Sequence, residues 1–219
     1  MKILGRRKAR RLAAADAFRV ARRVIDEDVT VLGEQLAELH TETLTSVIDE
    51  EMREDYQRAL DAYERAKAQL GQAIAPADLS AVNLLLDDGR FARACVLARR
   101  DGEEPPHRRE ACFFNPQHGP GATEVEWAPS GGVPRTVSVC RADANRLANG
   151  ELPPVRMVKT AAGLVPWHAA GPYLSGVGIS TAHVHGTDSV HTMGALADVY
   201  IRQSINPPGG QGMGGGITG

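Results

Sequence analysis

Four residues near the middle of the chain have the types and the spacing of metal ligands. Cys112 and His118 are followed by Cys140 and Asp143, in the pattern C-x5-H-x21-C-x2-D. Zinc binds thiolate, imidazole and carboxylate groups in a tetrahedron, and a site closed by four protein ligands is structural rather than catalytic. We therefore expect these four side chains to form a structural zinc site.

Other interpretations of the same residues stay open. His107 is an alternative fourth ligand, because Asp143 can instead stabilise the first turn of a helix expected over residues 143–149. A thiol beside an imidazole can also act as a nucleophile. The alternative to a structural site is therefore a metal- or thiol-dependent enzyme that uses the same two cysteines and the histidine of the motif.

The segment that contains these residues has the pattern of a small β-hairpin module. Two short stretches, residues 124–127 and 135–139, flank a turn rich in Pro and Gly. Metal binding would supply folding energy to a segment with few apolar residues. Phe113, Phe114 and Trp127 would also make a compact core without metal, so metal-free packing of the two cysteines stays open as an alternative.

Apolar residues in the first half of the chain recur at alternating intervals of three and four, the spacing of a coiled-coil seam. The first series consists of Arg22, Ile25, Val29, Leu32, Leu36 and Leu39, with Phe18 one heptad before Ile25. The second consists of Met52, Tyr56, Ala59, Tyr63, Ala66 and Leu70. The two series are out of phase, so the seam breaks near residues 40–50. This indicates either an antiparallel hairpin or one long helix with a phase slip, and we favour the hairpin.

Two shorter helices are expected after Pro76, over residues 77–88 and 90–100, with Gly89 between them. Cys95 is interpreted as a small buried hydrophobic residue of the second helix. Because short isolated helices are marginal in water, the whole helical region must bury its apolar stripes within the chain, against a partner or against a second copy.

Basic residues dominate the start of the chain. Residues 1–25 contain nine Lys and Arg against one acid, whereas residues 26–65 contain thirteen Asp and Glu against three Arg. A cationic helix on an anionic membrane surface is one interpretation, and a solvated N-terminus facing the acidic block is the other. Nucleic acid is not an expected partner, because no aromatic residues interleave with the arginines. The basic residues concerned are Lys2, Arg6, Arg7, Lys8, Arg10 and Arg11.

The composition of the whole chain limits its class. It has 219 residues and a formal net charge of −2, and an odd count of three cysteines without an export signal argues against a disulfide framework. No stretch approaches the roughly 20 apolar residues of a membrane helix, and no export signal opens the sequence. We expect a cytoplasmic protein, with attachment to the inner membrane surface as an open alternative.

The last quarter of the chain is rich in Gly, Pro and His. Residues 164–173 form an aromatic and proline-containing stretch for which packing within the chain is favoured over a partner site. His183 and His185 would share one face of a strand, although a polar surface loop is the favoured interpretation over a metal site. A helix over residues 193–203 and a disordered Gly-rich tail complete the chain.

Several stretches resemble an uncharacterised family of actinobacterial proteins. They are Cys112-Phe-Phe-Asn-Pro-Gln-His-Gly-Pro, Trp127-Ala-Pro, Val139-Cys140-Arg-Ala-Asp-Ala144 and Asp55-Tyr-Gln-Arg-Ala-Leu-Asp-Ala-Tyr-Glu-Arg-Ala-Lys67, within roughly residues 25–175. The resemblance implies a coiled helical region joined to a cysteine module. Members of the family carry Cys-x-x-Cys where this chain has Cys140-Arg-Ala-Asp143, which implies a ligand role for Asp143.

Taken together, these patterns predict an α+β protein that is mainly α-helical. The expected parts are a basic start (1–24), a helical coiled-coil region (25–102), a Cys/His module (105–150), an extension (151–205) and a tail (206–219). No constellation of catalytic residues is evident in the cysteine module. We therefore expect a non-enzymatic scaffold or adaptor that acts through helix association, with a protein partner or with itself, and through the module.

Overall fold

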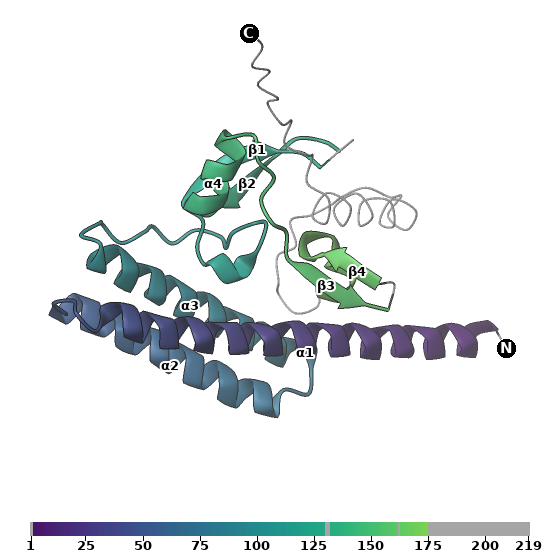
Figure 1. Ribbon diagram of the computed structural model, residues 1–219. Helices are drawn as coiled ribbons and strands as arrows, with labels where there is room; N and C mark the ends of the chain where they lie inside the picture. The colour runs from purple at the N-terminus through teal and green to yellow at the C-terminus, as the bar shows by residue number, and fades with distance from the viewer. Residues whose placement is uncertain (1, 130–131, 162, 175–219) are drawn as a thin grey trace, which may run out of the picture. The chain divides into compact units, whose positions relative to one another are not determined.

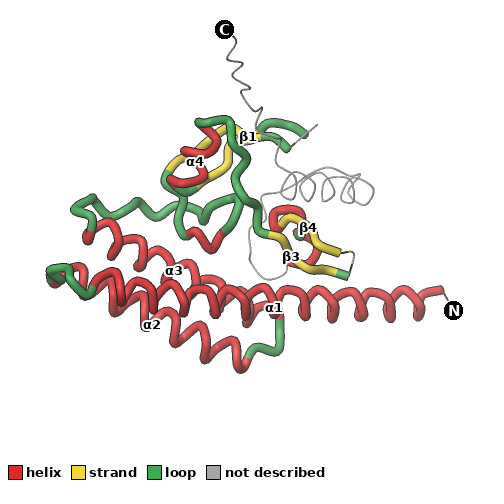
Figure 2. Tube along the Cα trace, viewed as in Figure 1, coloured by secondary structure: helices red, strands yellow, loops and turns green. Residues whose placement is uncertain are grey.

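The computed structural model describes residues 2–129, 132–161 and 163–174 (Figure 1). These residues all belong to one unit of the chain, residues 1–184. Its described part is mainly helical with two small antiparallel hairpins, which confirms the expected fold class (Figure 2). His183, His185, the helix expected over residues 193–203 and the Gly-rich tail lie outside the described residues.

Three helices form a layer that contains most of the apolar core. They are α1 (Lys2–Thr43), α2 (Glu50–Gln72) and α3 (Pro76–Arg100). α1 and α2 form the expected hairpin around residues 44–49 (Figure 1), so the single long helix is excluded. Most residues of the two apolar series are buried in the shared core of these helices. The seams are therefore covered within one chain.

Side-chain and proline signals define where α2 and α3 begin. Asp49 Oδ1 accepts a hydrogen bond from the Met52 N–H at 2.8 Å, which caps α2. Pro76 occupies the start of α3, where its missing N–H leaves no helical bond unmade. Asp78 Oδ2 accepts from the backbone N–H groups just before that helix, and these bonds lower the pKa of Asp78.

α3 is one continuous helix, so the expectation of two shorter helices separated at Gly89 was wrong. A Cβ atom at Gly89 would lie 2.9 Å from Leu32 Cδ2 and 3.3 Å from Ala62 Cβ. The glycine therefore allows α3 to approach both other helices closely. This packing outweighs the helix propensity that glycine loses, about 1 kcal/mol relative to alanine.

The Cys/His module follows the helical layer. It contains a 3₁₀ turn η1 (Pro116–His118), a hairpin of β1 (Thr123–Trp127) and β2 (Arg135–Val139), and the helix α4 (Arg141–Ala148). Thr123 pairs with Val139 and Trp127 with Arg135 in an antiparallel register. Both predicted strands are thus confirmed, and the predicted helix begins two residues earlier than expected.

A second hairpin, which the sequence patterns did not predict, lies beyond the module. It consists of β3 (Met157–Thr160) and β4 (Gly163–Pro166), followed by the turn η2 (Trp167–Ala169) and the short helix α5 (Gly171–Leu174). Trp167 and Leu174 are buried in the same core as the helical layer. This part of the aromatic stretch therefore packs within the chain, as favoured.

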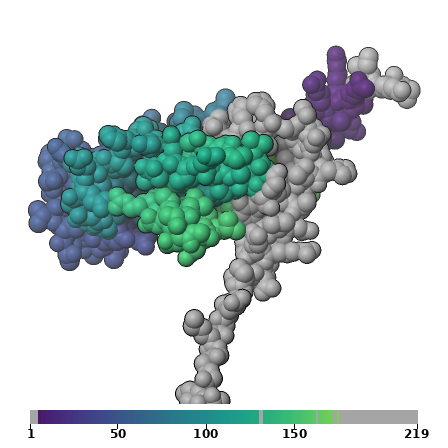
Figure 3. Space-filling model, turned by 90° about the horizontal axis from the view of Figure 1, so that it is seen from above, coloured from purple at the N-terminus to yellow at the C-terminus, as the bar shows by residue number. Residues whose placement is uncertain are grey.

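The module and the β3–β4 hairpin cover one face of the helical layer (Figure 3). Gln117 of η1 contacts Asp28 of α1, and Arg156 before β3 contacts the same aspartate. Among the described residues, no helix has both the length and the apolar character needed to cross a membrane.

Candidate metal centre

The loop before β1 brings Cys112 and His118 to the same place. Ala111 pairs with Pro120 in an isolated bridge, and the Cys112 N–H donates to the Gly119 carbonyl at 3.0 Å. The turn between them is the 3₁₀ helix η1, which Asn115 caps by accepting from the Gln117 N–H. This closed loop returns the chain so that His118, at the end of η1, lies beside Cys112.

The first turn of α4 supplies the other two side chains. Cys140 is the N-cap of α4, and its sulfur accepts a hydrogen bond from the Asp143 N–H at 3.5 Å. Residues three apart at a helix start lie on the same side of the helix. The spacing C-x2-D therefore places a sulfur and a carboxylate next to each other, facing the loop.

The four side chains converge on one point. Each offers a ligand atom, and all four atoms lie within 4.8 Å of one another. His118 Nδ1 is 3.0 Å from Asp143 Oδ2 and 3.5 Å from Cys140 Sγ, and Cys112 Sγ is 3.2 Å from Asp143 Oδ2. A tetrahedral zinc ion with bonds of about 2.0–2.3 Å separates its ligand atoms by about 3.3–3.8 Å. The cluster needs only small movements to reach that geometry.

Burial and mutual hydrogen bonds shift the pKa values of the cluster. A hydrogen bond to Cys140, together with burial, raises the pKa of the Cys112 thiol. The same hydrogen bond lowers the pKa of Cys140. A hydrogen bond to Cys112 and the charge of Asp143 raise the pKa of His118. The groups therefore compete for shared protons, which a bound cation would replace.

Groups around the cluster hold its charged atoms in position. Arg146 donates to Asp143 Oδ1 at 3.0 Å, which leaves Oδ2 facing the two sulfurs and the imidazole. The backbone N–H groups of Asn115 and Cys140 face the Cys112 sulfur and favour its thiolate form. Two thiolates and one carboxylate exceed the charge of a divalent metal by one, and Arg146 offsets that excess. Such second-layer contacts orient metal ligands.

The same geometry disfavours a nucleophilic Cys/His pair. A general base that activates a thiol uses one ring nitrogen for the nucleophile and the other for an orienting acid. Here the same atom, His118 Nδ1, faces both Cys140 Sγ and Asp143 Oδ2. One nitrogen cannot serve both roles, whereas a metal ligand needs only one nitrogen that faces the centre of the cluster.

The cluster also lies away from the two cavities found beside the helical layer. A cavity of about 350 Å³ is lined by charged residues of α2 and by Asp88 of α3. A second, of about 180 Å³, lies between α1, α3 and the module and is lined by residues such as Asp28, Phe113 and Trp167. None of the four cluster residues lines either cavity.

The remaining candidates from the sequence lie elsewhere. His107 is exposed and is not part of the cluster, so Asp143 is the fourth member. Cys95 is buried within α3, as expected, and burial raises its pKa. Phe114 and Trp127 stack edge to face at 5.5 Å. The aromatic core that was expected as the metal-free alternative therefore exists next to the cluster.

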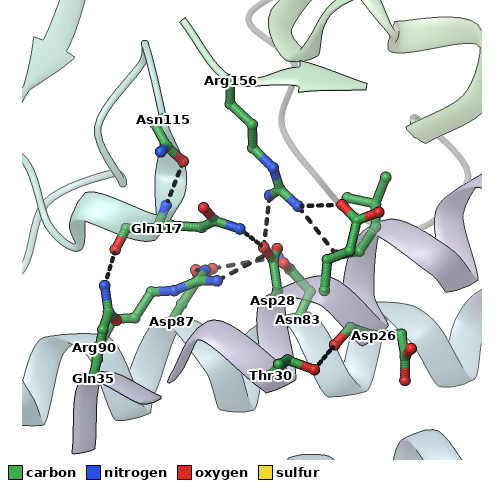
Figure 4. Close-up of polar contacts among 12 residues, drawn as sticks. Asp26, Asp28, Thr30, Gln35, Asn83, Asp87, Arg90, Asn115, Gln117 and Arg156 are labelled. Atoms are coloured by element: carbon green, nitrogen blue, oxygen red, sulfur yellow. Dashed lines mark hydrogen bonds and ion pairs between the residues drawn. The ribbon is translucent and has the colours of Figure 1, made fainter. Parts of the chain in front are cut away.

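A buried polar network joins the module to the helical layer, and the sequence patterns missed it (Figure 4). Asp28 Oδ1 accepts from Gln117 Nε2 at 2.8 Å and pairs with Arg156 at 2.7 Å. Arg90, whose side chain is 2% exposed, approaches Asp28 at 3.4 Å and Asp87 at 3.5 Å. The sequence offers one signal of it. Asp28 lies four positions before Leu32 on α1, and Arg90 lies four positions after Leu86 on α3, so each charged residue is on the same helix face as a buried leucine. That spacing predicts burial but names no partner.

Comparison with protein-family models, with curated proteins and with solved structures finds no match for this chain. The site is therefore interpreted from its own geometry.

Proposed function

We propose that the protein is a non-enzymatic adaptor whose module is held together by a structural zinc ion. Cys112, His118, Cys140 and Asp143 are its proposed ligands. The observation that carries the proposal is the convergence of their four ligand atoms within 4.8 Å. Two sulfurs, one imidazole nitrogen and one carboxylate oxygen form a donor set that suits zinc better than magnesium or calcium.

A structural role fits the surroundings of the cluster better than a catalytic one. Cys112 and Asp143 are fully buried, and a catalytic zinc site needs an open position for water or substrate. With four protein ligands, that position would be filled. The loop, the β1–β2 hairpin and α4 would then be linked through one ion, so metal binding would contribute to the folding free energy.

The adaptor role must rest on surfaces other than the two apolar seams. Those seams could have packed within the chain, against a partner or against a second copy, and most of their residues are buried among α1, α2 and α3 of the same chain. The part of α1 that precedes this core is exposed from Gly5 to Ala15. We propose this basic segment as the association surface. The thiol ligands require a reducing compartment, so we also propose a cytoplasmic location.

The metal content of purified protein tests the zinc centre. Mass spectrometry of protein prepared without a histidine tag should find one zinc per chain. Cys112→Ser and Cys140→Ser should each lose the metal and lower the melting temperature. Cys95→Ser is the matched control, because Cys95 lies in α3 outside the cluster, and it should keep its zinc.

Absence of stoichiometric metal from the wild type and from chelator-stripped, zinc-reloaded protein would overturn the zinc proposal. A thiol that reacts rapidly with alkylating reagents, together with turnover lost in Cys140→Ser, would then favour the thiol-dependent enzyme.

A further inference from the structure

The first part of α1 is a continuous stretch of exposed positive charge, which we call the basic arm. It comprises residues 5–15, and every one of its side chains is exposed. Five of these eleven residues are Lys or Arg and none is acidic: Arg6, Arg7, Lys8, Arg10 and Arg11. Among the described residues, no ion pair involves an arm side chain, since the nearest one joins Asp16 to Arg19. The arm is therefore an uncompensated charge.

The charge surrounds the arm instead of forming one face. Residues two positions apart on an α-helix lie about 200° apart around its axis, so Arg6 and Lys8 point to nearly opposite sides. Leu12, 63% exposed, is the one large apolar side chain described in the arm. A helix that lies within a membrane interface needs a broad apolar face, and this arm has none. Its partner must offer negative charge rather than an apolar surface.

The chain itself carries a matching negative segment. Residues 1–25 hold nine basic residues against one acidic, and residues 26–65 hold thirteen acidic against three basic. The rest of the chain is balanced, with thirteen of each sign. Several exposed carboxylates in the acidic segment make no ion pair among the described residues: Asp26, Glu34, Glu54 and Glu64.

The basic arm cannot reach the acidic segment of its own molecule. α1 is a single helix from Lys2 to Thr43, so the arm points away from the acidic half of the same helix (Figure 1). Lys2 to Arg19 spans about 26 Å and Asp26 to Glu42 about 24 Å of helix, at 1.5 Å per residue. The positively charged and the negatively charged stretches of α1 are thus similar in length. In a dimer with a twofold axis, the arm of each molecule can lie against the acidic segment of the other.

We propose that the basic arm docks on the acidic α1–α2 surface of a second copy of this chain. In the dimer, the arm of each molecule covers the acidic surface of the other. This names the partner for the proposed adaptor role and rests on that role, although it does not depend on the metal. The contact is mainly electrostatic, because the arm offers little apolar area. It should therefore weaken as salt screens the charges.

Sedimentation equilibrium of the full chain, zinc-loaded and zinc-free, tests the proposal with two charge-reversed variants. The arm variant carries Arg6→Glu, Arg7→Glu, Arg10→Glu and Arg11→Glu, and the acidic-surface variant carries Asp26→Lys, Glu34→Lys, Glu54→Lys and Glu64→Lys. Wild type should dimerise at about 50 mM NaCl, with a Kd that rises roughly tenfold or more at about 500 mM. Each variant alone should be monomeric, because its two segments repel those of another copy.

An equimolar mixture of the two variants should restore a dimer, since the acidic arm of one matches the basic surface of the other. Circular dichroism identical to wild type excludes misfolding as the cause of monomerisation. A wild type that stays monomeric at low salt, a dimer that survives arm reversal, or a mixture that does not pair would each overturn the proposal.

Binding of the wild-type arm to phosphatidylglycerol vesicles or to duplex DNA without self-association would also overturn it. That result would leave the adaptor role intact with a different partner. Zinc content is measured on the same samples, so loss of the metal proposal is recognised separately from loss of the dimer.

Discussion

At the scale of single residues, His168 shows how strongly the aromatic core of the module constrains a titrating group. Its ring stacks on Phe113 with centroids 4.8 Å apart and lies beside Trp127. The side chain is buried, and its Nε2 has no hydrogen-bond partner among the described residues. Burial and the neighbouring Arg135 guanidinium lower the pKa of His168 from 6.5 to about 4. The neutral ring is thus part of the folded core.

This pKa predicts a loss of stability in mild acid. Between pH 6.5 and 4 the unfolded chain binds the proton of His168 more tightly than the folded chain does. The stability contributed by the neutral ring is therefore complete above about pH 6.5 and is lost as the pH falls, by about 3 kcal/mol at pH 4. Urea unfolding at several pH values measures this loss.

His168→Phe provides the control, because it keeps a stacked ring and removes the titrating nitrogen. Its free energy of unfolding should decline less between pH 6.5 and 4 than that of wild type. Equal declines in the two proteins would show that other groups cause the acid sensitivity.

Single residues also show what a sequence pattern can reveal about the site. The pairs Cys112–His118 and Cys140–Asp143 are close in the chain, and local structure brings the members of each pair together, so spacing was enough to select them. The choice of Asp143 over His107 was harder. A position in the first turn of a helix suits a capping carboxylate as well as a ligand, and only the structure places Asp143 in the cluster and His107 outside it.

At the scale of elements, η1 links the proposed metal centre to the helical layer. Its three residues include a cluster member, His118, and a docking residue, Gln117. The side-chain amide of Gln117 donates to Asp28 at 2.8 Å, and the backbone carbonyl of Gln117 accepts from the side-chain amide of Gln35 at 3.0 Å. A contact that fixes Gln117 or His118 in position therefore also restricts the other residue.

Gln117→Ala should weaken both docking and metal binding. The substitution leaves buried Asp28 without one of its donors, a loss of about 1–3 kcal/mol in the free energy of unfolding. Because coupling between two contacts is reciprocal, zinc affinity should also fall, roughly fivefold. Chemical unfolding and competition with a chromophoric chelator measure the two effects.

Gln57→Ala is the control for this substitution, because Gln57 is exposed on α2 and its side chain bonds its neighbour Asp61 rather than any residue of the network around Asp28. It should change neither quantity. A Gln117→Ala protein that loses stability while it keeps wild-type zinc affinity would show that η1 does not couple the two sites.

Element prediction succeeded for the long apolar series and for the two short strands that flank a turn rich in Pro and Gly, and it failed for β3 and β4. The two apolar series predicted the α1–α2 hairpin because each extends over several turns. β3 and β4 have four residues each, too few for a period to stand out. Gly89 was wrongly interpreted as a helix end, because its close contacts come from Leu32 and Ala62, residues that sequence alone does not place beside it.

At the scale of the whole described unit, stability comes from two different sources. The helical layer has a continuous apolar core that includes Leu32, Leu39, Leu79 and Leu86. The module has a small aromatic cluster and the proposed zinc ion. The polar network around Asp28, which connects the two, could not be inferred from the sequence because its members are up to 128 positions apart, from Asp28 to Arg156.

Removal of the metal should therefore loosen one part and spare the other. On treatment with a strong chelator, amide hydrogen exchange should accelerate in β1, β2 and α4. The central turns of α1, α2 and α3 should stay protected, because their core does not depend on the cluster. Hydrogen exchange with mass spectrometry distinguishes these segments, and a uniform loss of protection across both parts would contradict the separation.

The continuity of α1 also gives the basic arm a defined helical phase. With 42 residues in one helix, an insertion near Ala14 would rotate everything before it by about 100° per added residue and advance it by about 1.5 Å. Binding to a partner that contacts only one face of the arm would be lost after one inserted residue and restored after about four. Because arginines and lysine project on several sides, contact by this arm should tolerate rotation and respond mainly to length.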